Sequence, residues 1–482
     1  MRIIGEEQFD SYWKNRAGNS GDPFVENIVR DIIADLRSEG DSALRRYTER
    51  FDRVSLRQFE VPFEKARAAR GTLVKEEPEL ASALELAAAH IRRFADLQCS
   101  QITDFETEMS PGLFTGQRVI PVERAAIYVP GGRFPLFSSV LMGVIPALAA
   151  GVGEVVLASP PVENGVPDKH ILAALAIAAS VPPAGPPETE KMPGFDKTRI
   201  SGTRSLWGFS PNDKENAQFC AFSTLQAPMP RIFAIGGAQA IAALAIGTET
   251  VPKVDLIAGP GNKYVAAAKR MLFGEVGIDF VAGPTDVLVV SDTDTDADLA
   301  AADMLAQAEH DPDARARALV PSQGMAEKIA AALETRLARL PEQPGRIARA
   351  SLDSGGLIVV CRSKESAIRI ANVIAPEHLE LQTENTEAWI PFLKNYGSLF
   401  IGSLSAEVLG DYSAGINHTL PTSGNARFSG GLSVRHFLKI VTTLRCAPGE
   451  GFENARKAAE IIGGAEGLAA HARSAAARRE LS

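Results

Sequence analysis

Apolar positions near the start of the chain recur at helical spacing. They fall three and four residues apart over residues 25–36, and Gly40 follows as a helix stop. Asp41 can cap a second helix over residues 42–51. Residues 1–24 carry too little apolar surface to fold alone. We expect this N-terminal arm to dock on its own chain or on a partner subunit.

A second pattern begins near residue 119, where short apolar runs alternate with glycine loops and apolar helices. The first four runs are Ala125–Val129, Val155–Ala158, Arg231–Ile235 and Asp255–Ala258. Three more, with the sequences VLVVS, LIVVC and SLFIG, lie between residues 287 and 402, and the chain beyond residue 448 has helical composition. Repeated strand, loop and helix implies parallel sheets with helices on their faces. The predicted fold class is α/β, with two such units in succession.

One segment, residues 181–230, shows neither period and holds eight of the thirty prolines. It lies between a helix and the following strand, and therefore at the amino end of the sheet. Ligands of open parallel sheets bind at the opposite edge, beyond the carboxyl ends of the strands. We expect this segment to be a surface insertion, with a subunit contact as an alternative role.

Length, composition and charge narrow the class of protein. A chain of 482 residues exceeds what one hydrophobic core usually holds, so two or more domains are expected. The net charge of −9 and the pI near 5.5 do not indicate the excess of basic residues that is typical of nucleic-acid-binding proteins. Four separated cysteines without a CxxC pair favour a reducing compartment, and the acidic N-terminus does not resemble a signal peptide. Proline and glycine interrupt the most apolar segment, residues 140–158, so we expect a cytoplasmic protein without a membrane span.

Three polar residues follow the predicted strands of the first α/β unit. Tyr128, Gln239 and Asn262 all fall in or beside the glycine loops at the carboxyl ends of these strands. Because ligands bind at that edge of an open sheet, we expect these residues to line a ligand site.

The second half of the chain contains polar residues that could bind a metal or a substrate. They are Gln307, His310, Asp411, His418, Glu466 and His471. Gln307 and His310 share one face of a helix over residues 300–312, but a pair at this spacing is more often structural. Glu466 and His471 are five positions apart, which places them on different faces of an ideal helix. Taken singly, each of these residues is about as compatible with a structural role.

The adjacent pair Glu377 and His378 is more informative. Pro376 fixes an extended entry, and the apolar residues that follow alternate with polar ones, so the pair opens a strand. Carboxyl and imidazole groups have ordinary pKa values near 4.3 and 6.5, so the two side chains can divide acid–base work. A surface glutamate beside a half-buried histidine remains the alternative interpretation.

Together, these motifs resemble the histidinol dehydrogenase family from residue 120 nearly to the end of the chain. The segments that carry the resemblance are IYVPGG (127–132), GGAQAIAALAIGTETVPKVD (236–255), GPGNKYVAAAKR (259–270), GIDFVAGPTDVLV (277–289), AQAEHDPDA (306–314), APEHLEL (375–381), GDYSAGINHTLPT (410–422) and EGLAAH (466–471). They are long, ordered and jointly specific.

The resemblance implies a role for each candidate residue. It implies one Zn²⁺ per subunit held by Gln307, His310, Asp411 and His471, and NAD⁺ contacts by Tyr128, Gln239 and Asn262. It implies that Glu377 and His378 perform the acid–base chemistry. The implied substrate contacts are Thr285, Gln307, His310, His378, Asp411, His418, Glu466 and His471. The implied reaction is the two-step oxidation of L-histidinol through L-histidinal to L-histidine, the last step of histidine biosynthesis.

The resemblance also implies an architecture of two incomplete Rossmann-like domains, one inserted into the other. After an N-terminal arm (1–24), the first domain comprises residues 25–127 and 286–430. The second, NAD-binding domain comprises residues 128–285 with the insertion 181–230, and a helical tail covers residues 431–482. The arm and the tail exchange between the subunits of a homodimer.

This sequence departs from the family pattern at three places, and two rival functions stay open. Thr285 and Asp286 stand where serine and glutamate are usual, and the segment 181–230 has no counterpart in a typical member. None of these changes removes a candidate catalytic group. One rival is a related NAD-dependent dehydrogenase acting on another small alcohol, such as a sulfonated diol. The other is a zinc hydrolase in which Glu377 activates metal-bound water, whereas a non-catalytic scaffold has no need of these residues.

Overall fold

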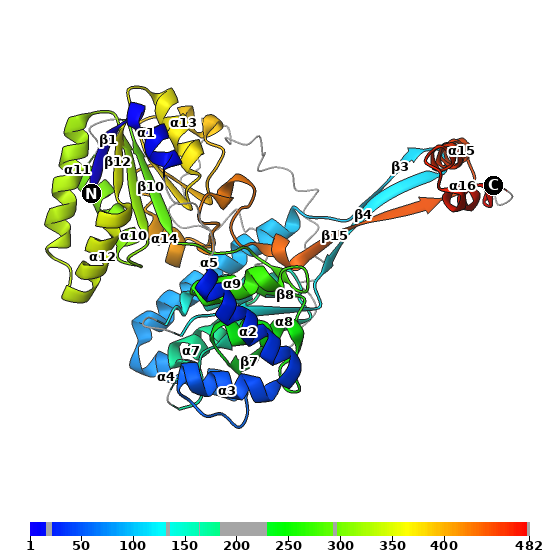
Figure 1. Cartoon of the computed structure of the whole chain (residues 1–482), viewed down its shortest axis with the longest axis horizontal. Helices are drawn as coiled ribbons and strands as arrows, with labels where there is room; N and C mark the ends of the chain where they lie inside the picture. Colours follow the sequence, from blue (N-terminus) through cyan, green and yellow to red (C-terminus); the bar gives the residue numbers. More distant parts are fainter. Residues whose placement is uncertain (16–21, 132–134, 163, 184–228, 293–295, 480–482) are drawn as a thin grey trace, which may run out of the picture.

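The computed structural model describes residues 1–15, 22–131, 135–162, 164–183, 229–292 and 296–479. These residues form two six-stranded sheets and one three-stranded sheet. Figure 1 shows the two larger sheets in separate α/β bodies, with the third sheet projecting from them as a long arm. The predicted α/β class with parallel sheets is confirmed.

The first six-stranded sheet, sheet A, is entirely parallel. Its strand order is β1 (Arg2–Gly5), β12 (Leu357–Val360), β11 (Arg315–Val320), β10 (Asp286–Ser291), β13 (His378–Gln382) and β14 (Ser398–Ile401). One face packs against α10 (Ala297–Ala308), α11 (Gln323–Leu337) and α12 (Glu342–Gly355), and the other against α1 (Glu6–Lys14) and α13 (Lys364–Ile374). Because both faces are covered, successive residues of β10 are all apolar from Val287 to Val290.

The second six-stranded sheet, sheet B, is parallel except at one edge. Its order is β2 (Glu60–Val61, antiparallel), β7 (Arg231–Ala234), β6 (Glu154–Ser159), β5 (Arg124–Tyr128), β8 (Leu256–Ala258) and β9 (Gly277–Ile278). The helices on one face are α4 (Glu64–Glu76), α5 (Pro78–Ser100), α6 (Ser138–Ala149) and α7 (Lys169–Ala178). Those on the other are α2 (Pro23–Glu39), α3 (Asp41–Asp52), α8 (Gly237–Ile246) and α9 (Lys263–Leu272). The order reverses between β5 and β8, and such a reversal creates a crevice beyond the carboxyl ends of the strands.

The third sheet is antiparallel and carries the C-terminal helices. Its strands are β15 (Leu438–Cys446), β4 (Leu113–Pro121) and β3 (Phe105–Ser110), followed by α15 (Glu450–Ala465) and α16 (Ala469–Ala476). In Figure 1 both helices lie at the far end of this arm, away from sheets A and B. The remaining short elements are α14 (Glu407–Tyr412) and the 3₁₀ turns η3 (Thr386–Ala388), η4 (Ile390–Phe392), η5 (Asn425–Arg427) and η6 (Val434–Phe437).

The two N-terminal helices form as predicted, with one difference in capping. Asp22 caps α2 by accepting a hydrogen bond from Phe24 N at 3.0 Å. Asp41 begins α3 but does not cap it, because its buried carboxylate accepts hydrogen bonds from the hydroxyl groups of Thr248 and Thr250. The predicted capping by Asp41 is therefore wrong.

The N-terminal arm docks on its own chain. Strand β1 pairs in parallel with β12, which makes it an edge strand of sheet A. Helix α1 follows and places the Trp13 ring 5.3 Å from the Arg317 guanidinium. Of the two predicted alternatives, docking on its own chain or on a partner subunit, the structure shows the first.

Sheet membership differs from the predicted domain division. Residues 25–127 were assigned to the domain of residues 286–430, but β2 and β5 lie in sheet B and the helices α2–α5 cover it. The predicted boundary at 127/128 falls inside β5. Helical periodicity shows that a helix has an apolar face, but long-range packing decides which sheet that face covers. The predicted helical tail 431–482 is likewise corrected, because residues 438–446 form β15.

Two further predictions concern residues 140–230. The apolar segment 140–158 forms most of α6, a turn and most of β6, as predicted. Among the described residues, no helix is both long and apolar enough to cross a membrane. Most of the predicted insertion 181–230 lies outside the described residues, which stop at 183 and resume at 229.

Candidate active site between the two α/β bodies

Glu377 and His378 lie at the amino end of strand β13 in sheet A. Helix α13 ends at Ile374, and the left-handed backbone of the next residue, Ala375 (φ 50°), turns the chain toward the sheet. Glu377 N then donates to Asp286 Oδ1 at 3.1 Å, and His378 is the first residue of β13. The pair therefore opens a strand as predicted, beside the first residue of β10.

Glu377 is held in a buried hydrogen-bond network. Its Oε2 accepts hydrogen bonds from the Thr285 hydroxyl and from Asp286 N, and the second measures 3.0 Å. Gln307 Nε2 donates in turn to Thr285 Oγ1 at 2.7 Å. Burial raises the pKa of Glu377 to about 7, although the positive charge of His378 and the Thr285 hydrogen bond oppose the shift. A carboxyl group that titrates near neutral pH can exchange a proton during a reaction.

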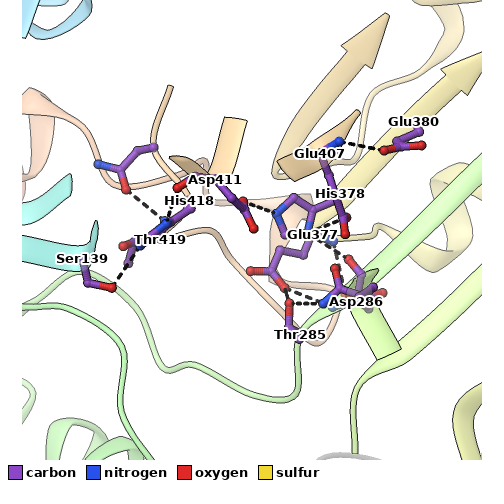
Figure 2. Close-up of polar contacts among 12 residues, drawn as sticks. Ser139, Thr285, Asp286, Glu377, His378, Glu380, Glu407, Asp411, His418 and Thr419 are labelled. Carbon is purple, nitrogen blue, oxygen red and sulfur yellow. Dashed lines mark hydrogen bonds and ion pairs between the residues drawn. The ribbon is translucent and has the colours of Figure 1, made fainter. Parts of the chain in front are cut away.

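The His378 imidazole lies between two carboxylates, as Figure 2 shows. Its Nε2 is 3.4 Å from Asp411 Oδ1, whereas its Nδ1 is 3.7 Å from Glu407 Oε2 and 3.4 Å from the Asp286 carbonyl oxygen. Burial lowers the pKa of His378, but the charge of Glu377, the hydrogen bond to Asp411 and the charge of Glu407 together raise it well above its ordinary value. The site thus favours the positively charged imidazolium.

Asp286 links the site to the N-terminal arm. Its Oδ2 accepts a hydrogen bond of 2.8 Å from Arg317, and both side chains are buried. The other oxygen of Asp286 holds the Glu377 backbone, and the Trp13 ring of α1 lies over Arg317. A buried ion pair needs such additional partners, because desolvation otherwise cancels its attraction.

His418 marks the contact between the two α/β bodies. Its Nε2 lies 3.0 Å from Ser139 Oγ at the start of α6, and its Nδ1 lies 2.9 Å from the Asp411 carbonyl oxygen. In the same loop, Asn417 Nδ2 donates to the Met142 carbonyl at 2.6 Å. Helix α6 follows the carboxyl end of β5, and Figure 2 shows its Ser139 beside His418, in the loop that follows Asp411.

The candidate metal ligands fall into two groups. Gln307, His310 and Asp411 lie near the amino end of sheet A. Gln307 bonds Thr285, His310 N donates to the Gln307 carbonyl, and Asp411 lies 3.4 Å from His378. Gln307 is 1% exposed, and its amide nitrogen is bonded to Thr285, so its oxygen is the available ligand atom. His471 and Glu466 are exposed at the end of the arm (Figure 1).

The three nearby side chains fit zinc but do not complete a site. Imidazole, carboxylate and amide oxygen are suitable zinc ligands, and a protein zinc site usually takes three or four side chains. Within the described residues of one chain, no group of three or more His, Cys, Asp or Glu side chains could hold a metal ion. A zinc site at this cluster would need a further ligand from outside it.

The candidate NAD⁺ contacts lie at the carboxyl edge of sheet B, as their loops predict. Tyr128 ends β5, and its hydroxyl oxygen accepts a hydrogen bond of 3.0 Å from Gly237 N at the start of α8. Gln239, in the first turn of α8, donates to Asp52 at 3.4 Å. Asn262 caps the N-terminus of α9. Burial raises the pKa of Tyr128 to about 12, so its phenol stays neutral at physiological pH.

A buried ion pair holds the glycine loop beside these residues. Gly259 has a φ of 116°, and a Cβ there would collide with the Tyr128 carbonyl oxygen. Asp279 accepts a hydrogen bond from Gly259 N at 2.8 Å, while Lys269 donates to Gly259 O at 3.0 Å and pairs with Asp279. These contacts hold the loop after β8 in place beside Tyr128 and Asn262.

Comparison with known proteins identifies the family. The family model described as histidinol dehydrogenase matches residues 15–181 and 197–479. A histidinol dehydrogenase from Thermus thermophilus is 41% identical over 465 residues, which cover 96% of this chain and 97% of the relative. The chain belongs to the histidinol dehydrogenase family. Another histidinol dehydrogenase, from Methylococcus capsulatus, is 39% identical over 95% of this chain and 92% of its own length.

A solved structure shares the whole fold. The crystal structure of histidinol dehydrogenase from Elizabethkingia anophelis matches with a TM-score of 0.81 and 32% identity, covering 99% of this chain and 97% of that one. Membership of the histidinol dehydrogenase family makes the chain an oxidoreductase and confirms the resemblance inferred from its motifs. The family model omits only residues 182–196 within its matched span, an interval shorter than the predicted insertion 181–230.

The structure adds residues that the motifs of the histidinol dehydrogenase family did not single out. Glu407 and Ser139 contact His378 and His418, and Asp52 contacts Gln239. Glu407 could have been found from its position four residues before Asp411, since that spacing places both on one helical face. No local pattern indicates Ser139 or Asp52, because their partners lie far away in the sequence.

Proposed function

We propose that this protein is a zinc-dependent histidinol dehydrogenase that oxidises L-histidinol through L-histidinal to L-histidine with two NAD⁺. The observation that carries the proposal is the buried Glu377–His378 pair, which faces Asp411 and the Gln307–Thr285 hydrogen bond in a chain of this family. The protein then acts in the cytoplasm on a small molecule, in the last step of histidine biosynthesis.

Each polar side chain of the site has a defined task in this proposal. When bound, zinc would hold the imidazole and amine of the substrate, and NAD⁺ would accept a hydride in each oxidation. His378 takes the hydroxyl proton of histidinol, and later that of the hydrated aldehyde. Glu377 takes a proton from the water that adds to the aldehyde, which its pKa of about 7 suits at neutral pH. Thr285 orients Glu377 and lies beside the bound substrate.

Residues from both bodies and from a second subunit complete the proposed site. Gln307, His310 and Asp411 supply three zinc ligands, and His418 lines the same pocket. We assign the fourth ligand, His471, and the substrate contact Glu466 to the partner subunit, because both lie at the far end of the arm. Tyr128, Gln239 and Asn262 contact NAD⁺ at the facing edge of sheet B.

Exposed apolar side chains on the arm support a homodimer with exchanged segments. They include Phe105, Met109, Leu444, Ile461, Ile462 and Leu468. Apolar residues gathered on one projecting element mark a protein contact surface. The projecting arm of β3, β4 and β15, together with the helices α15 and α16, would therefore pack on a second copy of this chain.

An assay of NADH formation tests the proposed function and its metal. With L-histidinol and NAD⁺, the purified enzyme is expected to produce two NADH per histidine, measured by absorbance at 340 nm. Treatment with a strong chelator should remove this activity, and added Zn²⁺ should restore it. Oxidation of a sulfonated diol in place of histidinol would support the related dehydrogenase. An enzyme with one zinc per chain that forms no NADH would contradict the proposal, and full activity of the metal-free enzyme would contradict zinc dependence.

Replacing Glu377 with glutamine is expected to slow the second oxidation selectively. The amide oxygen can still accept hydrogen bonds from Thr285 and Asp286 N, so the local structure should persist. It cannot take a proton from water, and we expect aldehyde oxidation to slow by roughly 100-fold while histidinol oxidation begins normally. Rates with L-histidinol and with L-histidinal, measured separately, distinguish the two steps.

A pH profile and a surface variant provide two further tests of the effect of Glu377→Gln on the two oxidation steps. Because Glu377 acts as a base when it is ionised, the rate of the wild-type aldehyde step should rise with pH around 7, before the further rise that His378 gives toward alkaline pH. The rise around pH 7 should disappear in Glu377→Gln. Glu384→Gln, which changes an exposed glutamate just beyond β13, should leave both steps unchanged. Equal slowing of both steps in Glu377→Gln would refute the proposed division of labour.

A further inference from the structure

Glu407 is a buried carboxylate directed at the imidazole of His378. It is the first residue of α14, it is 1% exposed, and its Oε2 lies 3.7 Å from His378 Nδ1. Asp411, one helical turn later, lies on the other side of the same ring at Nε2. Figure 2 shows the imidazole between these two residues. One short helix therefore supplies an acidic group to each ring nitrogen.

Packing alone does not explain a carboxylate at this position. Glu407 Oε2 is buried and has no hydrogen-bond partner among the described residues. An unsatisfied polar atom in the interior is unfavourable, more so when it is charged. An acidic residue in the first turn favours a helix through its dipole, but an exposed glutamate provides that benefit without the cost of burial.

The surrounding structure fixes the direction of this side chain. Glu407 N donates to Glu380 Oε1 at 2.8 Å, which anchors the first turn of α14 to β13. Glu380 accepts a further hydrogen bond of 2.9 Å from Gln382 of the same strand. Because His378 and Glu380 lie on one face of β13, the strand that carries the imidazole also holds the helix that carries Glu407.

The arrangement has a chemical consequence for a histidine that accepts a proton. A histidine that takes a proton at Nε2 becomes an imidazolium with a proton at Nδ1 as well, and a carboxylate beside Nδ1 stabilises that cation and holds the ring in place. The 3.7 Å separation is longer than a hydrogen bond, but contacts of this kind often shorten when substrate binds.

We propose that Glu407 is a positioning residue for His378, whose ring it holds with Nε2 toward the substrate. The proposal rests on the proposed function, in which His378 is the base. It adds a group that acts through His378 and does not itself touch the substrate.

Isosteric substitution separates this role from packing. Glu407→Gln keeps the volume but removes the acidic group, and we expect kcat for histidinol to fall roughly 10- to 100-fold, with KM within about twofold of wild type. Zinc content, measured by mass spectrometry, and melting temperature should not fall. Glu407→Asp, which keeps the carboxylate, should recover part of kcat. Asp41→Asn, which alters a buried carboxylate of α3 bonded to Thr248 and Thr250, should leave kcat unchanged.

A double-mutant cycle supplies a readout that a structural role would not change. In a His378→Asn background, Glu407→Gln should have no further effect on kcat, because its partner is already absent. Nitrogen-15 spectra of histidine-labelled enzyme, read without substrate, should show a shifted His378 ring signal in Glu407→Gln and not in Asp41→Asn. Wild-type kcat in Glu407→Gln, additive losses in the double variant, or an unshifted His378 signal would each overturn the proposal. Failure of the proposed function is distinct, since it appears as a wild-type enzyme that makes no NADH from histidinol.

Discussion

Replacing His378 with asparagine is expected to reduce kcat for histidinol oxidation by roughly 100- to 10,000-fold, the usual contribution of a positioned general base. The imidazole is the only group of the Glu377–His378 pair that faces Asp411, and its Nε2 lies 3.4 Å from Asp411 Oδ1. Asparagine is similar in size to the proximal part of the ring and can bond the Asp286 carbonyl, but it cannot accept a proton. The loss should therefore appear in kcat and not in folding.

Steady-state rates of NADH formation, together with melting temperature and zinc content, test this expectation. His170→Asn is the matched control, because His170 lies on α7 and its ring bonds Glu77 at the end of α4. It should leave kcat within about twofold of wild type and change at most the stability. If His378→Asn retains more than about a tenth of wild-type kcat, His378 is not the base of the first step.

The pKa of His378 gives this base a recognisable pH dependence. Burial lowers the pKa, but Glu377, Asp411 and Glu407 raise it well above its ordinary value. The proton-accepting neutral imidazole therefore becomes more abundant only as the pH rises. We expect kcat/KM for histidinol to increase from neutral toward alkaline pH in the wild type, and the residual activity of His378→Asn to lack this increase.

The sequence predicted those parts of the fold that depend on neighbouring residues. Alternating strands and helices between residues 119 and 402 identified most strands of both parallel sheets, since each buried strand is a short apolar run. Pro376 and the alternation after it correctly placed Glu377 and His378 at the start of a strand. The helices α2 and α3 likewise follow directly from apolar spacing and a glycine stop.

The parts that were missed depend on partners distant in the sequence. Strand β15 pairs with β4 across more than 300 residues, and most of its side chains are exposed, so no alternation of buried and exposed positions reveals it. Strand β1 joins β12 across a similar separation. The assignment of α2–α5 to the wrong domain has the same origin, because an apolar helix face does not specify which sheet it will cover.

The candidate site likewise divides into residues that the fold of one chain brings together and a residue that it leaves apart. The sequence supplied Gln307, His310 and Asp411, and the fold brings them to one edge of sheet A. It supplied His471 only through the family resemblance, and the single chain leaves that residue exposed on α16 at the end of the arm. Geometry within one chain cannot bring the fourth proposed ligand to the other three while β3, β4 and β15 hold the arm extended.

A complementation experiment is expected to show that His471 acts in the neighbouring subunit. The variants His378→Asn and His471→Asn should each be nearly inactive, because one lacks the proposed base and the other a proposed zinc ligand. In a mixed dimer with exchanged tails, one site receives both defects, whereas the other combines an intact His378 with an intact His471 of the partner subunit. Random mixing should make half of the dimers mixed, each with one working site, so about a quarter of wild-type activity should return.

The measurement is the rate of NADH formation after the two variants are unfolded together and refolded, or are expressed together and purified with two different tags. Refolding each variant alone provides the baseline, and refolded wild type provides the maximum. Zinc content should rise in parallel, since His471→Asn alone is expected to bind the metal weakly. If His471 instead served its own chain, every mixed dimer would carry one defect in each site, and no activity would return on mixing. The recovered fraction therefore distinguishes a site built by one chain from a site shared by two.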